Sequence, residues 1–165
     1  MIWVNIIAVL VLVLSLLGGL KEGAVKQFFN LAVLIIAIPL TGLSYHLLAN
    51  ILSFLPGKDW ENFIGFFITL AIISVILHLI VLLPRKIFQS IWRKGLLFRL
   101  FGGALNMVNA SIGMVLFALV LSAYPIFDWL ERAVVGSAVL ASLVDVFGFV
   151  QALLPQVFQS AAVAA

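Results

Sequence analysis

Four long apolar runs without a single charged side chain constrain this fold more than any other feature of the sequence. They cover residues 1–20, 27–57, 62–84 and 100–127. Each is long enough to cross a hydrocarbon layer of about 30 Å, which takes about 20 residues of helix. Because backbone groups in lipid must be hydrogen-bonded internally, and none of the runs alternates like a barrel strand, we expect transmembrane helices.

The sequence therefore predicts an all-α integral membrane protein with four transmembrane helices and C-terminal amphipathic, interfacial helices. Only 9% of the residues are charged, whereas a soluble domain has about 25%. The predicted units are a transmembrane domain over residues 1–124, with spans at about 2–20, 28–50, 62–83 and 100–124, and a tail over residues 125–165.

Prolines lie near the ends of three of these runs and inside one of them. We expect Pro56-Gly57 to end the second span, Pro84 the third and Pro125 the fourth, since proline lacks the N–H that continues a helix. Pro39 lies inside the second span and predicts a kink. The four Trp residues are expected at membrane–water boundaries, where an indole is most stable: Trp3, Trp60, Trp92 and Trp129.

The uneven distribution of cations predicts an orientation. Seven of the nine lie in the first and third connections: Lys21, Lys26, Arg85, Lys86, Arg93, Lys94 and Arg99. Lys58 lies in the second connection and Arg132 in the tail. With four spans, these two segments are expected on the opposite side of the membrane. The positive-inside rule places the first and third connections in the cytoplasm and both termini in the periplasm. Since no cation precedes the first run, we expect an uncleaved anchor there.

The tail allows two interpretations. Residues 133–154 are long enough to cross, but Asp145 would then lie near the bilayer centre at a cost of about 2.5–3.5 kcal/mol. One or two helices in the outer interface avoid this cost. We therefore favour the interfacial interpretation over a fifth span.

Small and amide side chains mark a candidate helix-packing or polar face. They are Gly19 and Gly23 in a GxxxG motif that ends the first span, and Gly102, Asn106, Asn109 and Gly113 along one seam of the fourth. Such a face brings backbones close together, with each amide bonded to a neighbouring helix. The alternative is a polar path or a docking face for a partner.

The basic third connection has two interpretations as well. Its cations are Arg85, Lys86, Arg93, Lys94 and Arg99. They serve to set the topology, or they attract anionic lipids at about 1 kcal/mol each. The segment is too short and too apolar to predict binding of nucleic acid.

Catalytic and metal-binding groups are sparse. There is no Cys, and His46 and His78 are expected on opposite sides of the bilayer, so they cannot share a metal. No acid lies within a span to complete a proton relay, so we expect each imidazole to make a simple hydrogen bond. We predict no catalytic residue, cofactor or metal site, and no enzyme.

Short segments spread over nearly the full chain follow the pattern of one known family. They are residues 1–5, 19–26, 99–102, and Trp129 and Ser137 in the tail. The pattern resembles the colicin V production protein family, CvpA, of small bacterial inner-membrane proteins. Gly23 and Lys26 match its Gly-rich, basic first turn. The departures are Asn5 in place of Asp, Glu22 in place of a basic residue, Asn106 and Ala110 in place of Gly, and Asn109 in place of Lys or Arg.

The resemblance implies an inner-membrane protein without enzymatic activity that acts in bacteriocin production and export or in envelope homeostasis. We expect an accessory protein that contacts the bilayer and assembles with itself or with an export apparatus. The alternative is a small transporter or channel whose path follows the face of the fourth span. An intramembrane enzyme ranks third, since the sequence shows no catalytic pair.

Overall fold

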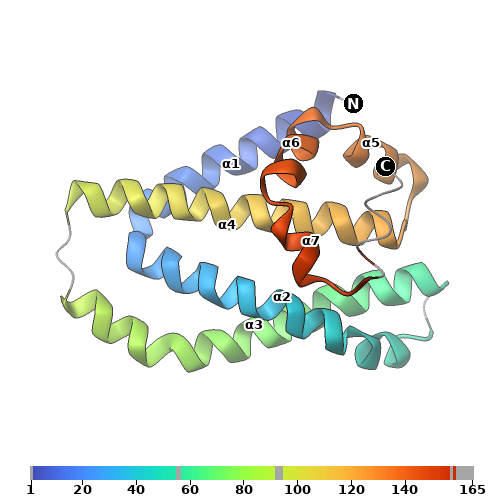
Figure 1. The fold of residues 1–165 in the computed structure, drawn as a ribbon, viewed down its shortest axis with the longest axis horizontal. Coiled ribbons are helices and arrows are strands. Elements are labelled where there is room, and N and C mark those ends of the chain that lie inside the picture. The colour runs from blue at the N-terminus through green and yellow to red at the C-terminus, as the bar shows by residue number, and fades with distance from the viewer. Residues whose placement is uncertain (1, 55–56, 92–94, 157, 159–165) are drawn as a thin grey trace.

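Four long helices form the body of the protein. The computed structural model describes residues 2–54, 57–91, 95–156 and 158. The long helices are α1 (Ile2–Glu22), α2 (Ala24–Ile51), α3 (Lys58–Ile91) and α4 (Leu96–Ala123), and they lie lengthwise beside one another (Figure 1). Each is long and apolar enough to cross a membrane, and the described residues form no strand. The predicted all-α membrane fold is therefore confirmed.

The helices pack in two pairs. α1 packs along α4 and α2 packs along α3, and the contact between α2 and α4 joins the two pairs. We call one end of the bundle the basic end. It contains the α1–α2 turn, the end of α3 and the start of α4, and it carries Lys21, Lys26, Arg85, Lys86 and Arg99 (Figure 1).

The predicted end of the third span at Pro84 is wrong, because α3 continues through this proline to Ile91. A proline removes only one donor from the helical ladder, and the residues beyond it have helical spacing of their own. Pro39 lies inside α2 as predicted, and its kink stays a prediction. Pro125 follows the end of α4 as expected, whereas Pro56 and Trp92 lie outside the described residues.

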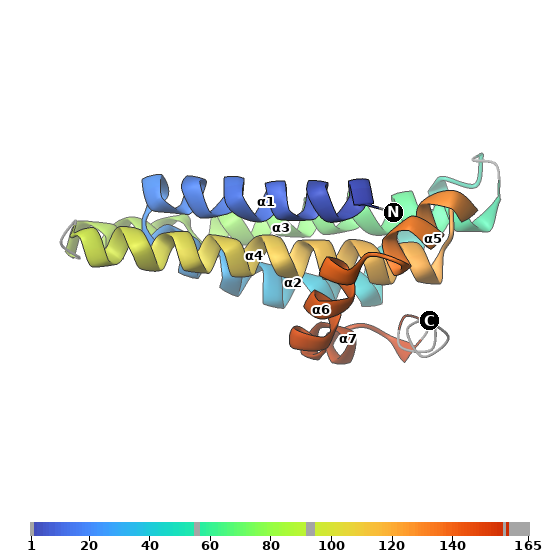
Figure 2. The same cartoon turned by 90° about the horizontal axis from the view of Figure 1, so that it is seen from above.

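The described part of the tail contains three short helices, none long enough to span a membrane: α5 (Asp128–Val135), α6 (Ala138–Val146) and α7 (Phe149–Leu153). The tail runs across α4 from the α1 side of the bundle to the α2 side (Figure 2). Val150 packs with Ile38 and Ile112, which lie midway along α2 and α4. Burial of such side chains packs the tail against the bundle, and its interfacial position stays a prediction.

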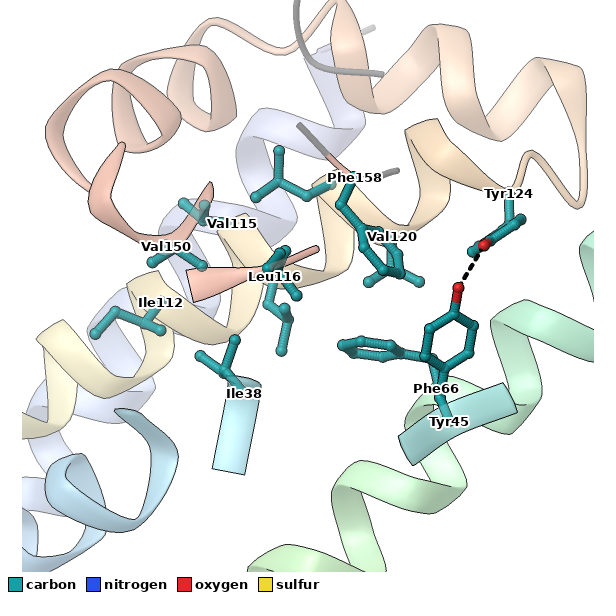
Figure 3. Close-up of a cluster of buried hydrophobic side chains, with 12 residues drawn as sticks. Ile38, Tyr45, Phe66, Ile112, Val115, Leu116, Val120, Tyr124, Val150 and Phe158 are labelled. Atoms are coloured by element: carbon teal, nitrogen blue, oxygen red, sulfur yellow. Dashed lines mark hydrogen bonds between the residues drawn. The ribbon is translucent and has the colours of Figure 1, made fainter. Parts of the chain in front are cut away.

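An aromatic cluster joins the tail to three of the long helices. The hydroxyl groups of Tyr45 and Tyr124 share a hydrogen bond of 2.7 Å (Figure 3). The rings of Phe66 and Phe158 pack on Tyr45 with centroid distances of 5.8 and 5.7 Å. Because Tyr45 is only 1% exposed, pairing the two hydroxyls removes the cost of burying each alone.

Asn5 of α1 holds the start of α6. Its Oδ1 accepts hydrogen bonds from Ser137 Oγ at 2.6 Å and from the Val139 N–H at 3.3 Å. Ser137 is fully buried, and its Oγ caps α6 by accepting from the Leu140 N–H. One side-chain oxygen of α1 therefore positions the N-terminus of a tail helix more than 130 residues away.

We expect Asn5→Ala to loosen the tail, because it leaves the buried Ser137 hydroxyl without its acceptor at a cost of about 1–3 kcal/mol. Amide hydrogen exchange in α6 should accelerate while exchange in α3 stays unchanged. Asn5→Asp is the matched control, since a carboxylate keeps both acceptor contacts and suits a helix N-terminus. Equal protection of α6 in Asn5→Ala and the parent would contradict this role.

Candidate functional site

The backbones of α1 and α4 meet where Gly19 faces Gly102. A Cβ added at Gly102 would lie 2.6 Å from the Gly19 carbonyl oxygen and 2.8 Å from the backbone nitrogen of Ala24. A Cβ at Gly19 would collide with the Gly102 backbone in the same way. Two predicted site residues are thus brought together, and only glycine fits at either position without moving a helix.

The two asparagines of the α4 seam continue this contact toward the middle of the bundle. Asn106 Nδ2 donates to the Ser15 carbonyl of α1 at 2.6 Å. Asn109 Nδ2 donates to both the backbone oxygen and the side-chain Oε1 of Gln27 in α2, at 3.2 Å each. The seam therefore connects α4 to α1 through one amide and to α2 through the other.

Gly23 and Gly113 do not make the close helix contact that was expected of the packing face. Gly23 forms the turn between α1 and α2 with φ +86°, a conformation that other residues rarely adopt. A Cβ at Gly113 would meet nothing within 4 Å, because this residue borders an apolar groove of about 380 Å³ between α1 and α4. The helices have diverged there, so the close contact ends before Gly113.

A chain of polar side chains that the sequence did not reveal starts from Gln27. Gln27 is 1% exposed, and its Nε2 donates to Glu22 Oε2 at 2.6 Å. Its Oε1 accepts from Asn30 Nδ2 at 3.2 Å, and Asn30 Oδ1 lies 3.1 Å from His78 Nε2. Gln27 and Asn30 are three residues apart in a long apolar run, which was the available sign of a shared polar face.

This chain corrects the expectation that each imidazole makes one simple hydrogen bond. His78 also lies 2.8 Å from the Ser74 carbonyl through Nδ1, so both of its ring nitrogens are engaged. Glu22, at the end of α1, is connected to the imidazole through the two amides, although it lies outside the span predicted from the sequence. His46 lies toward the other end of α2, exposed and stacked on Tyr45.

An open cleft of about 710 Å³ lies at the basic end. Lys21, Glu22 and Arg99 line it, and Arg99 Nε donates to the Leu20 carbonyl at 3.2 Å. Arg85 and Lys86 lie in the last turns of α3, while Arg93 and Lys94 lie outside the described residues. Within the described part of the chain, no three His, Asp or Glu side chains are grouped to hold a metal ion.

We expect Gly102→Ala to weaken the α1–α4 contact by about 1–3 kcal/mol, because the added methyl meets backbone atoms that cannot rotate away. Gly113→Ala is the matched control, since the same change enters open space and favours the helix by about 0.5–1 kcal/mol. Thermal unfolding in detergent should move in opposite directions for the two variants. Destabilisation of the same size in both would rule out the close approach.

Comparison with known proteins gives a family match. A family model described as Colicin V production protein matches residues 4–148, which run from the first turn of α1 through α6. No curated protein and no solved structure matches the chain.

Proposed function

Because the chain belongs to the colicin V production protein family, we propose that it is a non-enzymatic accessory protein of the bacterial inner membrane. It supports bacteriocin production and export or, more broadly, envelope homeostasis, and it assembles with itself or with an export apparatus. The observation that carries this proposal is the hydrogen bonding of the two asparagines in the α4 seam. Both asparagine amides donate to neighbouring helices, which makes the seam a structural contact of an assembled bundle.

A small transporter or channel is the second candidate. One observation favours it: Asn109 Oδ1 is buried and lacks a hydrogen-bond partner among the described residues. A transported ion or polar solute could use this oxygen. Against a path along the seam, the groove beside Gly113 is lined almost entirely by apolar side chains. The geometry supports packing of α4 more strongly than transport along it.

Production of the bacteriocin in a deletion strain separates the two candidates. If the seam is structural, Gly102→Leu should lose membrane abundance and production together, and Gly113→Leu, in open space, should keep both. Asn106→Ala should be mild, since an interhelical hydrogen bond in a membrane contributes about 1 kcal/mol. Normal abundance with lost production in Asn106→Ala would favour the transport candidate.

The partner is tested by affinity purification from native membranes that produce the bacteriocin. A tagged parent protein should retain a component of the export apparatus or a second, differently tagged copy, and Gly113→Ala should retain the same partner. Recovery of the protein alone, with full function in the same cells, would contradict an accessory role through assembly.

We also propose that the basic end faces the cytoplasm and both termini face the periplasm. The support is the excess of Lys and Arg at that end, which the positive-inside rule assigns to the cytoplasm. Anionic lipid headgroups are the expected bilayer partners of Arg85, Lys86 and Arg99.

Reporter fusions test this orientation. We expect activity of a cytoplasm-specific reporter after Lys26, and activity of a periplasm-specific reporter after Gly57 and at the C-terminus. A C-terminal fusion that is active only in the cytoplasm would overturn the orientation or the number of spans.

A further inference from the structure

All four long helices contribute to the open cleft at the basic end of the bundle. Lys21 lines it from the end of α1, Gln89 from the last turn of α3 and Arg99 from the first turn of α4. The first turn of α2 lines it through Ala24 and Val25. Its volume of about 710 Å³ lies in the range of small-molecule sites, which is about 300–1,000 Å³.

The acid at this cleft already has partners. Glu22 is the one acid among the described residues that line it. One carboxylate oxygen accepts from Lys26 Nζ and the other from Gln27 Nε2, both at 2.6 Å. Because the Glu22–Lys26 ion pair is neutral as a unit, Glu22 does not balance the other cations at the cleft.

Two cations at the cleft have no acidic partner. Lys21 makes no side-chain ion pair or hydrogen bond with the described residues. Arg99 Nε donates to the Leu20 carbonyl at 3.2 Å, and the terminal nitrogens of Arg99 have no partner in the described part of the chain. A guanidinium presents its N–H groups as a planar fork, which matches the oxygen atoms of a phosphate.

The starts of α2 and α4 add to the positive potential. Both helices begin at the cleft, where Gly23 and Gly95 precede their first turns. A glycine brings no side-chain acceptor to the first N–H groups of a helix, and each helix N-terminus carries about half a positive charge. The helix starts strengthen the site without defining it, because the cleft and its two unpaired cations attract an anion by themselves.

We propose that this cleft binds a phosphate monoester, with Lys21 and Arg99 as the side chains that hold it. A phosphate monoester carries a charge of about −1.5 to −2 at neutral pH and presents three acceptor oxygens, so two cations balance it. A phosphodiester carries only about one negative charge. Gln89, whose side chain has no partner among the described residues, supplies an amide donor from the α3 side.

Two sources offer this chemistry at the end of a membrane bundle. One is the headgroup of a phosphatidic acid lipid, and the other is a soluble phosphate ester. The inference rests on the lipid contacts proposed above only where the source is a lipid, and it is independent of the accessory role. It is also narrower than a general attraction of anionic lipids, because Lys86 carries the same charge at the same end but does not line the cleft.

Binding to the full chain in phosphatidylcholine nanodiscs tests the proposal with two probes. The lipid arm adds a small fraction of phosphatidic acid and measures the lipid that stays bound in native mass spectrometry. The soluble arm titrates glycerol 3-phosphate by calorimetry. We expect saturable binding of at least one probe. Nanodiscs leave both ends of the bundle open to solution, so an inverted orientation in the cell would not change this result.

Diester probes of the same kind are the matched ligand controls. Phosphatidylglycerol in the lipid arm and dimethyl phosphate in the soluble arm carry one negative charge each, so we expect them to bind more weakly than the monoesters. Binding of neither monoester would overturn the proposal. Diesters that bind as tightly as the monoesters would overturn the assignment to a monoester.

Matched variants test which cations form the site. Lys21→Gln removes a charge from the cleft without breaking a contact, so it should weaken binding about tenfold or more. Arg99→Lys keeps the charge but loses the planar fork, and it should also weaken binding. Lys86→Gln, outside the cleft, should change binding by less than about twofold, because solvent screens a distant exposed charge. Equal weakening by Lys21→Gln and Lys86→Gln would indicate a diffuse basic surface and overturn the site, and this comparison stands even if Arg99→Lys does not fold.

Discussion

The close approach of α1 and α4 at Gly19 and Gly102 is the contact on which the rest of the bundle depends. Lipid supplies no hydrophobic force between helices, so tight van der Waals contact and interhelical hydrogen bonds must hold them. Without a Cβ at either position the backbones meet directly, and the turn at Gly23 follows at once. This turn starts α2 beside α4 and brings Gln27 within reach of Asn109.

Polar side chains within the bundle act as connections between helices. Asn5, Glu22 and Asn109 are three of the positions that differ from the pattern the sequence resembles, and each forms a side-chain hydrogen bond to another segment. Asn5 holds the tail, Glu22 orients Gln27, and Asn109 holds α4 to α2. An unpaired polar group is costly inside a membrane, and these three side chains each have a partner elsewhere in the chain. Gln27, which binds both Glu22 and Asn109, is the shared partner of two of them.

The tail shows how packing changes the meaning of an amphipathic pattern. Its mixture of apolar and charged residues indicated short helices at the membrane boundary, and short helices are what the structure contains. Their apolar side chains nevertheless bury against α2 and α4, with Val150 fully enclosed. The exposed Asp145 remains on the outer side of α6, so the tail gains burial without enclosing a charge.

The sequence by itself determined that the chain is a membrane protein and that it forms four long helices. It also led to the expectation that Gly102 and Asn106 face another helix. Length, hydropathy and the spacing of small residues are local properties, and a helix in lipid satisfies its own backbone. Only the tertiary structure decided that Gly19 meets Gly102 while Gly113 meets open space, because two helices that cross at an angle touch over a limited length. It also decided the path from Glu22 to His78, since His78 follows Asn30 by 48 residues and only the packing of α2 on α3 brings the two side chains together.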